Sequence, residues 1–208
     1  MQDLNKALGD ISSIRMQVAR STDFRGYGPA TLAMTGVLAM GAAAAQWRWL
    51  PDAEEHTGAY LAIWIVTAVV SGAVIGTEMF ARTRRMHRGM ADEMIRMAVE
   101  QFLPSVAAGG LMTYALVRYV PAVEWMLPGL WQVIFSLGVF SSCRFLPRPM
   151  IAAGVWYLMT GVLSISLGDA RAFSPWVMGI AYGAGQMLVA GILLKESRKE
   201  AREGSDES

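Results

Sequence analysis

The chain contains six long apolar stretches, separated by short segments rich in proline, glycine and charged residues. The hydrocarbon core of a bilayer is about 30 Å thick, so an α-helix needs roughly 20 apolar residues to cross it. Inside lipid the backbone groups must also pair within the segment, as they do in a helix. We therefore predict an all-α fold, a polytopic membrane bundle of six transmembrane helices. The predicted spans are approximately residues 30–50, 58–80, 98–120, 127–146, 150–168 and 174–195.

Composition supports this class of protein. Hydrophobic residues make up 54% of the chain and charged residues 17%, whereas a typical soluble protein has about 25% charged residues. The formal net charge is only +1, which does not favour electrostatic attraction to nucleic acid. The bilayer is thus the expected partner, and direct binding of nucleic acid is not expected. The charged N-terminal twenty residues lack the apolar core of a cleavable signal peptide.

The distribution of positive charge predicts the orientation. If the N-terminus is cytoplasmic, only Arg48, Arg118 and Arg171 of the eighteen lysines and arginines face outward, and the other fifteen face the cytoplasm. Cytoplasmic loops normally carry this excess. Tryptophan and tyrosine residues gather near the expected outer interface, as in an aromatic belt. We predict a multi-pass membrane protein with both termini in the cytoplasm.

The segments outside the spans divide the chain into three parts. Residues 1–28 are predicted to form a cytoplasmic amphipathic helix and linker, 29–196 the transmembrane domain, and 197–208 a charged cytoplasmic tail. Leu4, Ile11 and Val18 recur at heptad spacing, but fewer than three heptads is weak evidence for a coiled coil. This helix either lies on the bilayer surface or docks a partner.

One set of polar residues is expected at the cytoplasmic mouth of the bundle. Glu78 lies at the end of span two, and Arg144 lies at the end of span four. Glu100 and Gln101 lie at the beginning of span three. Such residues are usually interfacial ion pairs or snorkelling side chains. Paired carboxylates beside one arginine would alternatively titrate unusually and form a proton-linked or ligand-binding site.

Two glutamines lie deeper in the predicted spans. Gln132 falls near the outer end of span four, and Gln186 about midway along span six. A glutamine at this depth normally hydrogen-bonds a neighbouring helix, although the two could instead line a polar cavity. No charged residue falls near the middle of a span, and ion pumps and proton relays normally need one there.

Cofactor sites are not expected. The two histidines, His56 and His87, fall in loops on opposite sides of the predicted membrane, and Cys143 is the single cysteine. Neither a haem nor a zinc centre can be built from them. A methionine stripe could relay copper(I), but an amphipathic interfacial or partner-docking helix fits it better. Its members are Met86, Met90, Met94 and Met97.

Two glycine pairs have the G-x-x-x-G spacing that lets helices approach closely in lipid. They are Gly72 with Gly76 in span two, and Gly179 with Gly183 in span six. Packing within the bundle is the usual role of such a pair, and contact with another copy is the alternative.

Several runs resemble a family of uncharacterised bacterial six-span membrane proteins, over about residues 3 to 195. The runs are RSTDFRGYGPATLAMTGVLAM, RMAVEQFLPSVAAGGLMTY, LPGLWQVIFSLGVFSSCRFLPRP and WYLMTGVLSI. Genes of this family often lie beside a winged-helix transcriptional regulator. The resemblance implies an inner-membrane location and a regulatory connection, and it carries over no catalytic residues.

Two functional classes remain. Signatures of hydrolases, metalloproteases and nucleotide-binding enzymes are absent from the sequence. We therefore expect a non-enzymatic sensor, scaffold or accessory subunit that acts through its cytoplasmic rim. Its expected partners are further copies, a larger membrane complex, or a cytoplasmic regulatory protein. The alternative is a small-molecule transporter or exporter with a polar site at the cytoplasmic mouth.

Overall fold

A computed structural model describes residues 28–85, 88–143 and 148–206, and this part of the chain is helical with no strand. The long helices are α2 (Pro29–Trp49), α3 (Thr57–Arg85), α4 (Arg88–Tyr119), α5 (Leu127–Ser142), α6 (Ile151–Ser166) and α7 (Pro175–Asp206). Short 3-10 turns join them: η1 (Pro121–Met126), η2 (Arg148–Met150) and η3 (Ala170–Phe173). Each predicted apolar stretch therefore corresponds to one helix.

The local sequence explains where several helices begin and end. Proline occupies the first turn of α2 and of α5, where its missing N–H has no partner to lose. After α6 the chain reverses at Gly168, whose φ of 72° lies in the left-handed region that favours glycine. Pro104 lies inside α4, a position that helices in lipid tolerate better than helices in water.

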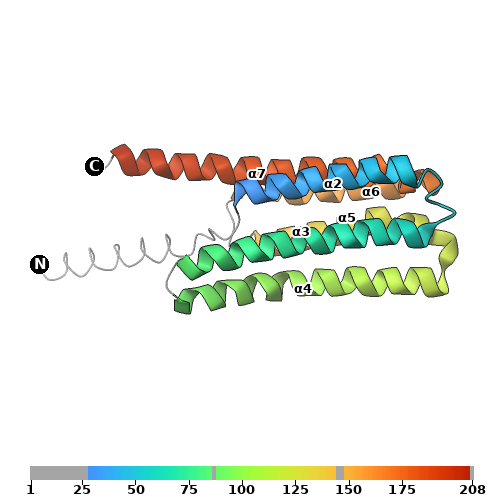
Figure 1. Ribbon diagram of the computed structural model, residues 1–208, viewed down its shortest axis with the longest axis horizontal. Helices are drawn as coiled ribbons and strands as arrows, with labels where there is room; N and C mark the ends of the chain where they lie inside the picture. Colours follow the sequence, from blue (N-terminus) through green and yellow to red (C-terminus); the bar gives the residue numbers. More distant parts are fainter. Residues whose placement is uncertain (1–27, 86–87, 144–147, 207–208) are drawn as a thin grey trace, which may run out of the picture.

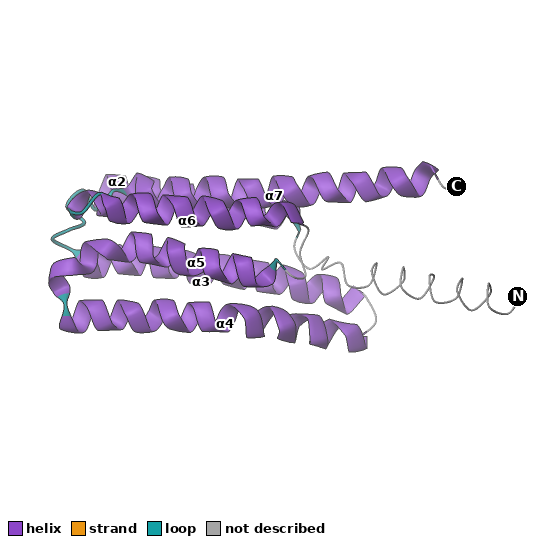
Figure 2. Cartoon of the chain, turned by 180° about the vertical axis from the view of Figure 1, so that it is seen from behind, coloured by secondary structure: helices purple, strands orange, loops and turns teal. Residues whose placement is uncertain are grey.

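The six long helices run side by side and close into a ring. Each contacts the next helix along the chain, and α2 packs most extensively against α7, which completes the ring. The α2–α3 turn, η1 and η3 lie at one end of the bundle (Figure 1), and the reverse view shows the same antiparallel arrangement (Figure 2). Helix α7 continues beyond the others as one helix to Asp206.

Two helix pairs form the tightly packed part of the ring. Between α2 and α7, a Cβ added at Gly36 would lie 3.0 Å from the carbonyl oxygen of Gly183. Between α5 and α6, a Cβ added at Gly129 would lie 2.7 Å from the carbonyl oxygen of Gly161. These backbones approach so closely that a larger side chain has no room. The glycines therefore set the helix spacing, as small residues do in membrane bundles.

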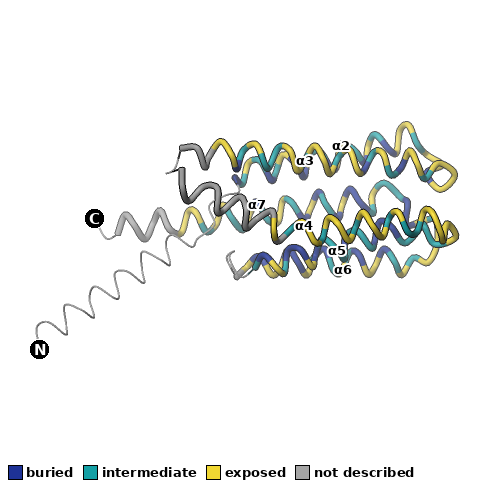
Figure 3. The backbone as a smooth tube through the Cα atoms, turned by 90° about the horizontal axis from the view of Figure 1, so that it is seen from below, coloured by how far each residue is buried: buried dark blue, intermediate teal, exposed yellow. Residues whose placement is uncertain are grey.

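Helices α3 and α4 are packed much more loosely. Among the described side chains of α3, only Tyr60, Trp64 and Met79 are buried, and none of those described on α4 is buried. The burial-coloured tube shows the difference: exposed positions dominate α3 and α4, while buried positions follow α2 and α5 (Figure 3). The bundle thus has a compact side and a sparsely covered side.

Tryptophan side chains connect neighbouring helices through hydrogen bonds. The indole N–H of Trp131 on α5 donates to Thr113 Oγ1 on α4 at 2.8 Å. The indole N–H of Trp156 on α6 donates to the carbonyl of Ala181 on α7, also at 2.8 Å. In a double-mutant survey, an interhelical hydrogen bond in lipid contributed about 0.6 kcal/mol on average. These contacts therefore fix register more than they supply stability.

Four helical segments of the described chain are long and apolar enough to cross a membrane. They are Pro29–Trp49, Thr57–Ala81, Pro121–Ser142 and Pro175–Lys199, while Ile151–Ser166 is apolar but shorter. Helix α4 is not among the four, since charged residues occupy its first half and Arg118 its last turn. The chain is thus a helical bundle with the features of a membrane protein. Residues 1–27, in which the amphipathic helix and linker are predicted, lie outside the described part.

Candidate functional site

A buried glutamine joins three elements near the end of the bundle that holds the α2–α3 turn. Gln46 on α2 is fully buried; its Oε1 accepts a hydrogen bond from the indole N–H of Trp64 on α3 at 2.8 Å. Its Nε2 donates to the carbonyl oxygen of Phe173 in η3 at 2.7 Å. The amide therefore uses both ends to hold α2, α3 and η3 together. We call this arrangement the Gln46 latch.

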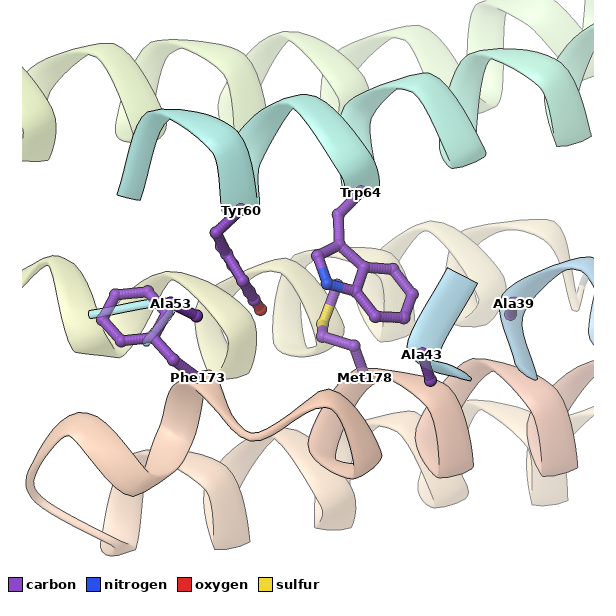
Figure 4. Close-up of a cluster of buried hydrophobic side chains, with 7 residues drawn as sticks. All are labelled: Ala39, Ala43, Ala53, Tyr60, Trp64, Phe173 and Met178. Carbon is purple, nitrogen blue, oxygen red and sulfur yellow. The ribbon is translucent and has the colours of Figure 1, made fainter. Parts of the chain in front are cut away.

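Aromatic side chains pack next to the Gln46 latch. Tyr60 and Trp64 project from α3 toward η3 and the beginning of α7, where Phe173 and Met178 meet them (Figure 4). The rings of Tyr60 and Phe173 are 4.9 Å apart in an edge-to-face arrangement, which is a favourable geometry for aromatic pairs. Tyr60 and Trp64 are thus the residues through which the loosely packed α3 reaches the core.

A second buried glutamine lies deeper in the bundle. Gln132 on α5 is fully buried, and its Nε2 lies 3.3 Å from the carbonyl oxygen of Val177 and 3.7 Å from Met178 Sδ. The 3.3 Å contact is long for a hydrogen bond. Its Oε1 has no hydrogen-bond partner among the described residues. Gln132 consequently links α5 to α7 with one end of its amide and leaves the other end unsatisfied.

Tyrosines extend this polar region along the inside of the bundle. Tyr182, one turn beyond Met178 on α7, has its ring 5.4 Å from Tyr157 and 5.5 Å from Phe135. It also packs against the buried cluster that contains Tyr60. Tyr60 and Tyr157 are fully buried, and neither hydroxyl has a hydrogen-bond partner in the described chain. We call Tyr60, Gln132, Tyr182 and Tyr157 the interior polar row.

The chemistry available in the interior polar row is neutral hydrogen bonding. Phenol hydroxyls donate and accept, and the Gln132 carbonyl oxygen accepts. Buried polar groups in native proteins are nearly always paired with protein or with ordered water. The row is therefore suited to bind a neutral polar molecule, and it offers neither a nucleophile nor a charged ligand for a metal.

The other glutamine predicted to line a cavity lies elsewhere. Gln186 on α7 is half-buried, and its Cβ faces Gly36 of α2. It lies two helical turns beyond Met178, about 12 Å along α7 at 1.5 Å per residue. Gln132 and Gln186 therefore face different neighbours, α7 and α2 respectively.

The cluster predicted at the cytoplasmic mouth is only partly described. Glu78 is half-buried near the end of α3, Glu100 is exposed on α4, and each has an interacting partner. Arg144 and the side chain of Gln101 lie outside the described residues. The convergence of these four residues stays a prediction.

The predicted docking residues also fall outside what is described. This holds for Leu4, Ile11, Val18 and Met86, and for the side chains of Met90, Met94 and Met97, whose backbone belongs to α4. Their roles stay predictions. Among the described residues, no group of three or more His, Cys, Asp or Glu side chains could hold a metal ion.

Shifted pKa values outside the membrane-length helices include those of Cys143 and Asp169. Partial burial raises the pKa of the Cys143 thiol, which keeps it protonated at neutral pH and weakens it as a nucleophile. In the turn after α6, Asp169 accepts hydrogen bonds from the side chain and backbone of Arg171 at 2.9 Å. These bonds lower the pKa of the exposed carboxyl. Both features fit structural roles.

Sequence reasoning missed the Gln46 latch and the buried, unpartnered hydroxyl of Tyr60. Gln46 stands beside Trp47 and Arg48 at the end of an apolar stretch, where a polar residue is expected to reach water. The available signal was helical spacing, because Gln46 continues the buried stripe of Leu32, Ala39 and Ala43.

Comparison with family models, curated proteins and solved structures finds no match for this chain.

Proposed function

We propose that this chain is a non-enzymatic six-span protein of the bacterial inner membrane, acting as a dimeric sensor, scaffold or accessory subunit. Chain connectivity supports six crossings. Helix α3 ends at one end of the bundle and α5 begins at the other, so α4 must pass between them (Figure 1). The same holds for α6, which connects the end of α5 to the beginning of α7. Four membrane-length segments in this arrangement therefore support six crossings.

The charge distribution supports cytoplasmic termini. The end of the bundle that holds η1 and η3 carries exposed Trp47, Trp49, Tyr119 and Trp176, as expected for an outer aromatic belt. The arginine-rich last turn of α3 and the beginning of α4 lie at the opposite end of the bundle (Figure 1). This orientation follows the positive-inside tendency.

The uncovered face of α3 is the observation that supports a dimer. Ile65, Val69, Gly72 and Gly76 share one face of α3, and the valine at 69 is 65% exposed. A Cβ added at Gly72 or Gly76 would meet nothing within 4 Å among the described residues. The matching pair on α7, Gly179 and Gly183, is instead filled by α2. One G-x-x-x-G pair therefore serves the bundle, while the other is free to meet a second copy of the chain.

Dimerisation through α3 would also explain the cytoplasmic rim. Helix α3 ends with Arg82, Arg84 and Arg85, so two copies joined along this helix bring their arginine-rich connections together. A doubled basic surface suits an acidic partner better than a single one, because clustered charge focuses the local field. The expected partner is a cytoplasmic regulatory protein, consistent with the regulatory connection that the family resemblance implies.

Cysteine cross-linking in native membranes tests the dimer. In a Cys143→Ser background, Val69→Cys should form a disulfide between two copies on mild oxidation. Val162→Cys on α6, which is 52% exposed, is the matched control and should not. Adding Gly76→Ile to the Val69→Cys chain should abolish the cross-link, because the bulky side chain separates the two helices. Absence of a Val69→Cys dimer, or equal dimer formation at position 162, would contradict the proposal.

Transport of a small molecule is the second candidate, and the interior polar row favours it. Unsatisfied polar groups along the inside of a ring of helices are what a path for a neutral solute requires. If transport is the function, Gln132→Leu should abolish the cellular phenotype while the Val69→Cys cross-link persists. If scaffolding is the function, Gly76→Ile should abolish the phenotype and Gln132→Leu should leave it intact.

A further inference from the structure

The strongest unexplained feature of the interior is a pair of fully buried polar atoms that flank the same side chain. The Tyr60 hydroxyl points toward Met178 from α3 (Figure 4). The Gln132 amide approaches Met178 from α5, with Nε2 3.7 Å from Sδ. Neither the Tyr60 hydroxyl nor Gln132 Oε1 has a hydrogen-bond partner among the described residues. Two unsatisfied groups, one on α3 and one on α5, thus lie near the same methionine side chain.

The assignment of the Gln132 amide is supported by its other end. Its Nε2 lies beside the carbonyl oxygen of Val177, at 3.3 Å. Turning the amide over would place two acceptors, Oε1 and that carbonyl, against each other. The unsatisfied end is therefore the carbonyl oxygen, which requires a donor. The Tyr60 hydroxyl requires an acceptor for its proton.

We infer that one small neutral molecule binds beside Met178 and bridges these two groups, donating to Gln132 Oε1 and accepting from the Tyr60 hydroxyl. Both requirements are met by one oxygen that carries a hydrogen, either a water molecule or the hydroxyl of a small solute. A cation is disfavoured because the described side chains of the cluster around Met178 include no carboxylate, and an anion because Gln132 presents an acceptor. The inference does not depend on the dimer proposed above.

The position of this site has a structural consequence. Tyr60 belongs to α3, which buries few other residues, and Gln132 belongs to the compact α5–α6 side. A bridging molecule would therefore attach the loosely packed helix to the core, one turn away from the Gln46 latch at Trp64. Occupancy of the site would then control how firmly α3 is held.

A double-mutant cycle of thermal stability tests the bridge. The variants are Tyr60→Phe, Gln132→Met and their combination, in detergent-solubilised full-length protein. We expect each single variant to lower Tm by about 2–4 °C, the shift that one lost hydrogen bond gives in a protein of this size. The double variant should fall little further, because either change already breaks the bridge. Tyr114→Phe, at a side chain that is 61% exposed, is the control and should leave Tm unchanged.

Two arms distinguish water from a hydroxyl-bearing solute. The cycle is measured in glycerol-free buffer and again with glycerol, with the general effect of glycerol subtracted by means of the Tyr114→Phe control. If the Tm effects of Tyr60→Phe and Gln132→Met are coupled without glycerol, water is a sufficient ligand. If they are coupled only with glycerol, the ligand is the hydroxyl-bearing solute. Additive effects in both arms would overturn the inference. So would a rise in Tm for Tyr60→Phe, since removing a hydroxyl that nothing satisfies should stabilise the protein.

Discussion

Replacing Gln46 with leucine removes the latch that joins α2, α3 and η3 while leaving the size of the side chain nearly unchanged. Two groups then lose their partners, the Trp64 indole N–H and the Phe173 carbonyl oxygen. A buried group left unsatisfied costs about 1–3 kcal/mol, so two cost about 2–6 kcal/mol. Two hydrogen bonds of average strength in lipid would contribute only about 1 kcal/mol together. Gln46 lies about one turn from the end of α2, where water can relieve part of the penalty, so we expect a loss of about 2 kcal/mol.

The assay is reversible unfolding by SDS titration in mixed micelles, with Trp64→Phe and the double variant completing a cycle. The double variant should be more stable than the sum of the two single losses predicts, because Trp64→Phe removes one of the orphaned groups. Trp47→Phe is the control, since that neighbouring indole is 66% exposed, and it should change stability little. Wild-type stability in Gln46→Leu, or strictly additive losses in the cycle, would refute the latch.

Three further perturbations have defined outcomes. Gly161→Leu should lower the free energy of unfolding by about 1–3 kcal/mol or more through overpacking, because an added Cβ would lie 2.8 Å from the Gly129 carbonyl oxygen. An unchanged Tm would contradict the close α5–α6 contact. Arg144→Ala should lower Tm modestly and Glu78→Gln with Glu100→Gln should partly restore it, whereas a large loss that the glutamines do not relieve would reject the predicted cluster. Deleting residues 2–20 should reduce the particle mass by light scattering or the recovery of a partner without unfolding the bundle, and unchanged values of both would remove the N-terminal helix from the assembly.

The helices could be predicted from the sequence because lipid imposes a simple rule on it. A stretch of apolar residues ended by proline or charge has only one low-energy structure in a bilayer. The predicted span at 30–50 accordingly matches α2, and that at 150–168 matches α6 with its flanking turns. The charged ends of two helices were not predicted from the apolar stretches. Composition placed the beginning of the third span near residue 98 and the end of the sixth near 195, whereas α4 begins at Arg88 and α7 ends at Asp206.

The pairing of side chains could not be predicted in the same way. Gln46 and Phe173 are 127 residues apart in the sequence, and their contact exists only because α2 packs against α7 to close the ring. The two G-x-x-x-G pairs show the same limit. They have identical spacing, yet Gly179 and Gly183 are covered by α2, whereas Gly72 and Gly76 are open within the described chain. Local pattern indicates that a helix can pack closely, and topology decides which helix it meets.

Side-specific cysteine labelling tests most directly whether six antiparallel helices cross the membrane with both termini in the cytoplasm. In a Cys143→Ser background, single cysteines replace Glu54, Ala122 and Asp169, which lie in the three connections at one end of the bundle, and a fourth replaces Ser205. We expect that a membrane-impermeant maleimide added to intact spheroplasts labels the first three and not the fourth, while inverted vesicles give the opposite result. Labelling of position 54 only from the cytoplasmic side, or labelling of positions 54, 122 and 169 from different sides, would contradict it.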